Sequence, residues 1–275
     1  MSMEVFVPTE YEIEESQRQD EEYELYEREK RCEAESYEHW KNKLPHLIFK
    51  YRSLSSSIEL TRTIDILQNH RLFMSPSKYL NDPFEGGNVD YLPKDTIDLF
   101  EVEKKKCRIL SLSENCFSAP LWAHYASNCT GVCIGFSTYK KFERITPMQY
   151  TDIIDKKQWW TCEPKLAIEK EYNYKNNDWS YEREYRIIGQ SPKADENEKV
   201  YFDFEQDELA IIILGEWIDK EIKEVIIKAV PDTCRIFNIK SDNERSQYYL
   251  FKNGIADKEK NKIYSLDDLY AEIIK

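Results

Sequence analysis

The chain has 275 residues, of which 41% are hydrophobic and 33% are charged, and its formal net charge is −13. This length and apolar content allow one large domain with appendages or two small ones, and they exclude a wholly disordered protein. The negative charge leaves no broad cationic surface for a nucleic acid backbone, and no apolar run reaches the about 20 residues that span a bilayer.

Residues 1–45 form an acidic segment with fourteen acidic and six basic residues. Its Glu, Arg and Lys residues favour helix, and pairs such as Glu24 with Arg28 have the stabilising i,i+4 spacing. We therefore expect a helical N-terminal extension. It is either a solvated helix that rests on the main domain or an acidic surface for a basic partner protein.

Residues 46–240 are expected to form the globular domain. Apolar alternation predicts strands in seven segments: 46–52, 71–75, 108–113, 131–136, 208–214, 224–230 and 236–239. Helical spacing predicts helices over 57–69 and 120–126, and turn residues predict a loop over 81–87. Because strands and helices follow no regular βαβ rhythm, the expected class is α+β.

Residues 241–275 are expected to form a helical tail packed on that domain. An amphipathic helix runs through four apolar positions, namely Leu266, Leu269, Tyr270 and Ile273. This gives three parts in all, with boundaries after residues 45 and 240.

The seven cysteines indicate the compartment. They are irregularly spaced and contain no C-x-x-C pair, which is typical of a reducing cytoplasm in which cysteine is a small apolar residue. The start of the chain is acidic and carries no secretory pattern. We expect a cytoplasmic protein with no membrane partner and no metal.

Residues 179–188 predict a strand that carries two carboxylates on one face. Because side chains alternate along a strand, Glu182, Glu184 and Arg186 would point the same way. Like charges on one strand face are disfavoured unless they are solvated on a sheet edge or needed in a cleft. Both explanations are open at this point.

Five motifs in order along the chain resemble an uncharacterised bacterial family catalogued as domain of unknown function 2971. They are Lys-Tyr-Arg at 50–52, Asn-Asp-Pro-Phe-Glu at 81–85, Leu-Trp-Ala-His-Tyr at 121–125, Gly-Val-Cys-Ile-Gly-Phe at 131–136 and the aromatic and acidic run at 179–186. The resemblance covers about residues 46–240 and implies no particular reaction.

Three elements of the chain also resemble the ADP-ribosyltransferase superfamily. Its members carry an aromatic residue and then Arg or His on a first strand, Ser-x-Ser on a second, and a catalytic Glu, often within Glu-x-Glu, on a later one. This chain offers Tyr51-Arg52, Ser111-Leu112-Ser113 and Glu182-Arg183-Glu184. The resemblance implies a mixed-sheet core that uses NAD as a substrate, as a transferase or a glycohydrolase, and a role as a bacterial toxin or antiphage defence effector.

The chemistry of the resemblance gives the residues their roles. Glu184 would stabilise the positive charge that develops on the ribose as nicotinamide leaves, and Glu182 would position or deprotonate the acceptor, a protein or a nucleic acid. Arg52, in competition with Lys50, would bind the phosphates. The full set of residues expected to contact the dinucleotide is Lys50, Tyr51, Arg52, Ser111, Ser113 and Tyr125.

Two other functions remain open. Asp155 followed by Glu163-Pro164-Lys165 imitates the acidic pattern of a metal-dependent nuclease, although Pro164 would cost a central strand one hydrogen bond. The non-enzymatic alternative is a nucleotide-sensing or protein-binding module, because a fold alone does not imply turnover.

Overall fold

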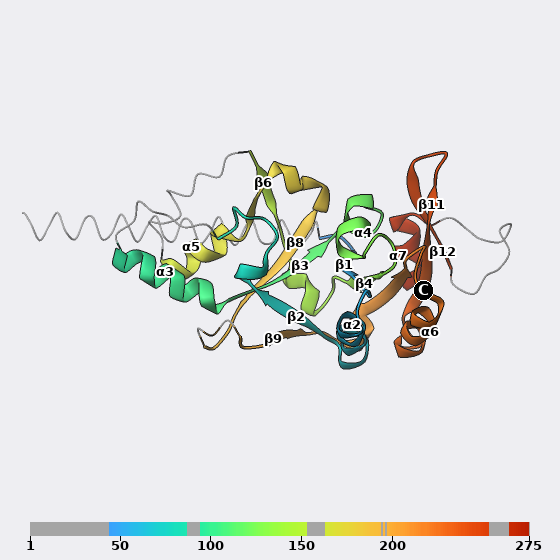
Figure 1. Cartoon of the computed structure of the whole chain (residues 1–275), viewed down its shortest axis with the longest axis horizontal. Helices are drawn as coiled ribbons and strands as arrows, with labels where there is room; N and C mark the ends of the chain where they lie inside the picture. The colour runs from blue at the N-terminus through green and yellow to red at the C-terminus, as the bar shows by residue number, and fades with distance from the viewer. Residues whose placement is uncertain are drawn as a thin grey trace, which may run out of the picture. The chain divides into compact units, whose positions relative to one another are not determined.

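A computed structural model describes residues 44–86, 94–152, 163–193, 195, 197–252 and 264–274. Pro45–Lys275 form one compact unit. It is a mixed α+β structure built on a large mixed sheet, as Figure 1 shows, which confirms the predicted class. Of the helical extension expected over residues 1–45, residues 1–43 lie outside the described residues, and so does the acidic partner surface expected there.

The main sheet has ten strands within the described residues. Eight follow one path in the order β12 (Gln247–Lys252), β11 (Arg235–Asp242), β10 (Leu209–Leu214), β4 (Val132–Ser137), β1 (Leu47–Arg52), β3 (Cys107–Ser113), β2 (Arg71–Pro76) and β9 (Val200–Asp203). Off this path, β8 (Glu184–Gln190) pairs with β3, and β5 (Thr146–Pro147) pairs with β8. A separate parallel pair joins β6 (Gln149–Thr151) to β7 (Tyr174–Asn176).

The helices lie around the sheet. The α-helices are α2 (Ser57–Asn69), α3 (Lys94–Lys106), α4 (Ala119–Tyr125), α5 (Pro164–Glu171), α6 (Lys220–Ala229) and α7 (Leu266–Ile274). The 3-10 turns are η1 (Ser77–Tyr79), η2 (Lys141–Arg144), η4 (Asn177–Glu182) and η5 (Gln206–Glu208). Among the described helices, none is long and apolar enough to cross a bilayer.

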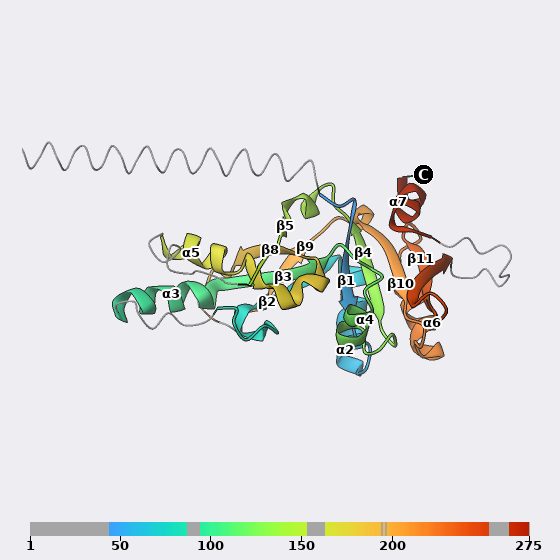
Figure 2. The ribbon, with the colours of Figure 1, turned by 90° about the horizontal axis from the view of Figure 1, so that it is seen from above.

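The sheet changes direction where β1 meets β3. These two strands share one paired position, Phe49 with Ser113, whereas β3 pairs with β8 along its whole length. In Figure 2, β2, β3 and β8 run across the direction of β1, β4 and β10. The site described below lies at this junction, because its lining includes residues of β1 on one side and of β2, β3 and β8 on the other.

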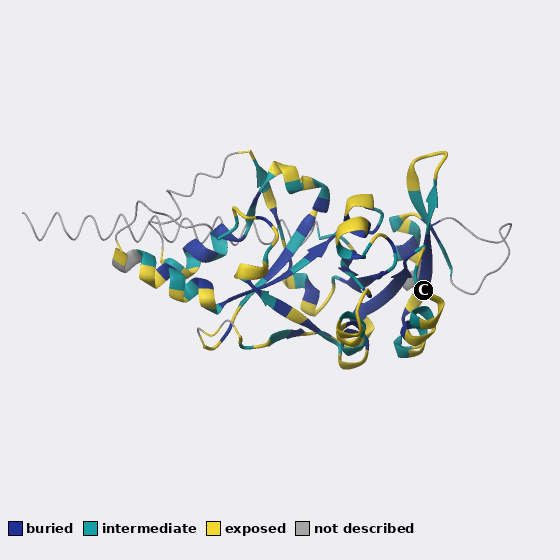
Figure 3. Cartoon of the chain, viewed as in Figure 1, coloured by how far each residue is buried: buried dark blue, intermediate teal, exposed yellow. Residues whose placement is uncertain are grey.

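One hydrophobic core lies between the sheet and helices α4 and α7. Trp122 on α4 is fully buried, and its ring meets that of Tyr51 edge-on at 5.3 Å. Its indole Nε1 donates a hydrogen bond to the carbonyl of Cys116 at 2.8 Å. Figure 3 shows the same pattern throughout, with buried central strands and exposed outer helix faces. Trp122 is thus a core residue, as expected for a large aromatic with its polar atom satisfied.

Helix α2 forms where the sequence predicts it. The side chain of Ser56 accepts a hydrogen bond from the backbone N of Glu59, which caps the first turn. His70 then ends the helix in the left-handed region, at φ 49°.

The predicted strand over residues 224–230 is wrong, because this segment lies in helix α6. Strands β10 and β11 run parallel, and a parallel pair needs a crossover connection, which α6 supplies. Asp219 caps the helix by accepting bonds from the backbone N of Glu221 and Ile222. Ile226 faces the core while Val225 is exposed, so the β-branched run is amphipathic at helical spacing.

The region after residue 240 is more than a helical tail. Strand β11 runs through residue 240, and β12 adds an edge strand to the same sheet before α7. The predicted boundary at residue 240 thus falls inside a strand, whereas the predicted final helix is confirmed as α7.

Candidate functional site

Neighbouring strands bring the three sequence motifs together. Strand β3 lies between β1 and β8, and Ser113 is the position opposite both Phe49 on β1 and Glu184 on β8. Ser111 pairs with Arg186 in the same ladder. The ends of the three motifs therefore meet at one place, where β1 and β8 flank the end of β3.

A cavity of about 240 Å³ lies at this meeting point. Sites for drug-sized ligands usually measure about 300–1,000 Å³, so the cavity encloses a nucleoside-sized group or one end of a longer ligand. Its charged and polar lining comes from Lys50, Tyr51, Ser75, Tyr79, Asn81, Glu85, Ser111, Ser113, Tyr125, Lys175, Glu182, Glu184 and Arg186.

The two predicted carboxylates both reach the cavity, although the strand predicted over 179–188 is wrong in its first half. Residues 177–182 form the 3-10 turn η4, and Arg183 turns the chain at φ 43° before β8 begins. Lys175 on β7 still joins the two side chains, because its Nζ lies 2.6 Å from Glu182 Oε2 and 3.0 Å from Glu184 Oε2. Both carboxylates are buried, which excludes the alternative of a solvated sheet edge.

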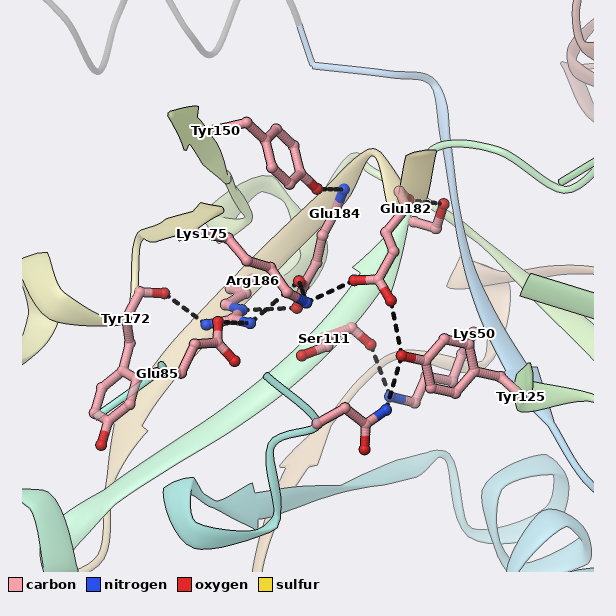
Figure 4. A network of polar contacts seen from close by, with 12 residues as sticks. Lys50, Glu85, Ser111, Tyr125, Tyr150, Tyr172, Lys175, Glu182, Glu184 and Arg186 are labelled. Atoms are coloured by element: carbon pink, nitrogen blue, oxygen red, sulfur yellow. Dashed lines mark hydrogen bonds and ion pairs between the residues drawn. The ribbon is translucent and has the colours of Figure 1, made fainter. Parts of the chain in front are cut away.

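Arg186 holds Glu184 from the other side, as Figure 4 shows. Its Nε and Nη2 donate to the two oxygens of Glu184 at 2.7 and 3.1 Å, and its Nη1 donates to the carbonyl of Tyr172 at 2.8 Å. Burial alone would raise the pKa of Glu184, but the charges of Arg186 and Lys175 outweigh it and lower this pKa to about 2. Glu184 is therefore an ionised carboxylate in a fixed orientation.

The loop that follows η1 supplies a third carboxylate. Asp82 accepts a hydrogen bond from the backbone N of Phe84 at 2.9 Å, which makes the turn predicted there. The turn directs Glu85 toward Arg186, whose Nη2 lies 2.5 Å from Glu85 Oε1, while Glu85 Oε2 is buried without a hydrogen-bond partner. Burial raises the pKa of Glu85 to about 7 against the opposing charges of Arg186 and Lys175.

The structure separates the two cations that compete on β1. Lys50 lines the cavity, and its Nζ donates to the carbonyl of Ser111 at 2.7 Å. Burial, together with the charge of Arg52, lowers the pKa of Lys50 to about 8, although Glu184 and Glu182 oppose the shift. Arg52 is not among the residues that line the cavity, and its Nε faces Thr63 on α2 at 3.5 Å. The structure thus places Lys50, and not Arg52, in the site.

Three other predicted residues border the cavity with their polar atoms already engaged. Tyr51 donates its hydroxyl to the carbonyl of Asn115 at 2.7 Å, and Ser113 donates to the carbonyl of Glu182 at 2.6 Å. The hydroxyl of Tyr125 donates to Glu182 Oε1 at 2.7 Å and accepts from Asn81 at 2.8 Å. Tyr51 and Ser113 support the site, whereas Tyr125 orients a carboxylate within it.

The sequence pattern of a nuclease has no matching geometry. Glu163 and Pro164 lie at the start of helix α5 instead of on a strand, and Asp155 is outside the described residues. Within the described ranges, no group of three His, Cys, Asp or Glu side chains is arranged to hold a metal ion. This alternative gains no support from the structure.

We predict that Glu85 makes the protein less stable as pH rises from about 4.5 to 7. Its folded pKa of about 7 lies above the ordinary 4.5, so the folded state binds the extra proton in this window and loses that advantage as pH rises. Urea unfolding across this range should show a drop of about 1–3 kcal/mol that Glu85→Gln abolishes. An identical slope in both proteins would contradict the assignment.

One family model matches a part of the chain. A model described as "Protein of unknown function (DUF2971)" matches residues 121–187. The matched segment runs from α4 into β8 and contains Tyr125, Lys175, Glu182, Glu184 and Arg186. It confirms the predicted resemblance over this segment, which holds the motifs at 121–125, 131–136 and 179–186, whereas the motifs at 50–52 and 81–85 lie outside the match. No curated protein and no solved structure matches the chain.

Proposed function

We propose from the site itself that this chain has an ADP-ribosyltransferase-like core and uses NAD, as a transferase or a glycohydrolase, because the family model that matches residues 121–187 describes no function. The observation that carries the proposal is the adjacency of β1, β3 and β8. It gathers a cation, a Ser-x-Ser strand and the two glutamates around one cavity. The proposal includes the biological role that the resemblance implies, a bacterial toxin or antiphage defence effector.

Glu184 has the properties that breaking the bond between nicotinamide and ribose requires. Positive charge develops on the ribose as nicotinamide leaves, and an ionised carboxylate that is already oriented stabilises it without reorganising. Arg186 fixes Glu184 through two hydrogen bonds. Lys175 pairs with both Glu182 and Glu184. When a ribose hydroxyl displaces Lys175 from Glu184, Lys175 therefore keeps its ion pair with Glu182.

Glu182 suits the acceptor side of the reaction. Tyr125 and Lys175 hold one oxygen each, so its direction is fixed near Glu184. A carboxylate in this position orients and deprotonates the nucleophile, which is water in hydrolysis and a protein or nucleic acid group in transfer. No metal takes part in this scheme.

Lys50 is the proposed contact for the dinucleotide phosphates, in place of Arg52. We predict that Lys50→Met weakens NAD binding by about tenfold or more with a smaller effect on kcat, because a charge-assisted contact to a phosphate changes little during the reaction. Arg52→Met is the matched control and should leave the dissociation constant nearly unchanged. Equal effects of the two substitutions on NAD binding would contradict this assignment.

The direct test is to incubate purified protein with NAD, with and without cell extract, and to follow nicotinamide release and ADP-ribose attached to acceptors. Release without extract indicates hydrolysis, and release that needs extract together with labelled acceptors indicates transfer. Absence of release in both conditions would overturn the enzymatic proposal.

A binding module without turnover is the second candidate. The observation that favours it is the neutralisation of Glu184 by both Lys175 and Arg186. Such a module would bind NAD or ADP-ribose in calorimetry without releasing nicotinamide.

A further inference from the structure

Two exposed aromatic side chains border the cavity, and the proposed chemistry assigns them no role. Strand β2 buries Leu72 and Met74, so the alternation turns Phe73 outward, where it is 46% exposed. Tyr79 in η1 is 64% exposed. Both residues line the cavity that also contains Glu182 and Glu184. Single exposed aromatics are common on protein surfaces, but two at one cavity suggest a ligand contact.

The ring of Phe73 is supported from the side. It meets the ring of Tyr201 on β9 at 5.9 Å in an edge-on arrangement. The guanidinium of Arg71 lies 4.4 Å from the centre of the Tyr201 ring, and Asp65 holds Arg71 at 2.9 Å. Phe73 therefore lies against an ordered layer, and a ligand that stacks on it loses little side-chain entropy.

A lysine lies beside the ring of Tyr79. The ammonium of Lys78 lies 5.2 Å from the centre of its ring. Arg71 lies over the neighbouring ring of Tyr201, where Asp65 balances its charge. Aromatic faces beside Lys and Arg are the usual surroundings of nucleobases and their phosphates in proteins.

We propose that Phe73 and Tyr79 form a stacking site for the purine base of the ligand. The inference rests on the proposed use of NAD and extends it to the other end of the dinucleotide. A cavity of about 240 Å³ encloses only one end of such a ligand, so once the nicotinamide ribose reaches Glu184 the adenine lies outside it. The two exposed rings then offer the adenine an aromatic surface.

The test compares two ligands in calorimetric titrations with the full chain. ADP-ribose carries the purine base, and ribose 5-phosphate carries none. Phe73→Ala and Tyr79→Ala should each weaken ADP-ribose binding by about tenfold, the usual loss on removing a stacked ring, and leave ribose 5-phosphate unaffected. Phe73→Tyr should retain the affinity.

Phe84→Ala is the matched control, because Phe84 is 67% exposed and is not among the cavity-lining residues. It should leave both affinities unchanged. The inference is overturned if ADP-ribose does not bind the wild-type protein, if the aromatic substitutions leave its affinity unchanged, or if they weaken both ligands equally. ADP-ribose binding that depends on Phe73 without NAD turnover would refute the enzymatic proposal alone. Turnover with a KM for NAD that is insensitive to both substitutions would refute the stacking site alone.

Discussion

Glu184→Gln is expected to slow nicotinamide release from NAD by about 100-fold or more. The amide keeps the shape of the side chain but loses the negative charge that opposes the developing charge on the ribose, so the loss falls on the transition state. The measurement is the initial rate at saturating NAD. Glu114→Gln is the control, because Glu114 contacts Tyr185 and Arg183 and is not among the cavity-lining residues.

The ion pairs of Glu184 require a stability measurement beside this rate. Glu184→Gln leaves Arg186 with Glu85 and the Tyr172 carbonyl, and Lys175 with Glu182, but it removes a charge that both cations share. Rates are therefore compared only at a temperature and urea concentration at which both proteins are folded. If folded Glu184→Gln retains the wild-type rate, the catalytic assignment moves to Glu182 or is abandoned.

Arg186→Leu is expected to lower the free energy of unfolding by about 3–5 kcal/mol. The substitution leaves Glu184 with Lys175 alone and removes the ion pair of Glu85, and breaking a buried ion pair by removing one partner is among the largest single destabilising effects. The midpoint of urea unfolding measures the loss at pH 7. Arg183→Leu is the matched control, because the side chain of Arg183 is 60% exposed and its ion pair with Glu114 is long, at 3.5 Å. This substitution should change the free energy of unfolding by no more than about 0.5 kcal/mol.

A double substitution tests the cause. The double variant Glu184→Leu, Arg186→Leu removes both charges of the pair. Its loss in free energy of unfolding should be smaller than the sum of the losses of the two single variants, because each single variant leaves one charge of the pair without its partner and the double variant does not. Additive losses would show that Arg186 stabilises the protein through packing rather than through its charge.

Local sequence patterns predicted most of the sheet, and tertiary context explains the main failure. Alternation and capping placed β1, α2, β3 and β10 correctly, because short-range preferences and burial agree in those segments. They failed for α6, where a run of β-branched residues is typical of a strand. What decided this segment was the parallel pairing of β10 with β11, a long-range feature that the local pattern does not contain.

The site was predictable as far as its residues lie within motifs. The spacing of Glu182 and Glu184 identified the two carboxylates. Lys50 and Arg52 have the same spacing and face the same side of β1, so the sequence does not show which of these two cations lines the cavity. Thr63 on α2 faces Arg52, and only the folded chain shows this. Lys175 had no sequence signal, since a lone lysine on a short strand is usually solvated.

The contact between Glu85 and Arg186 also bears on when the site appears during folding. It joins residues 101 positions apart, and the hydrogen bonds of Lys50 with Ser111 and of Tyr125 with Glu182 span 61 and 57 positions. Contacts this distant along the chain close large loops, and such loops form slowly compared with helices and hairpins. Glu85 therefore reaches Arg186 only once distant segments have met. The cations that neutralise Glu182 and Glu184 lie within nine positions of them, so these two carboxylates acquire their partners from the local chain, before the cavity around them is complete.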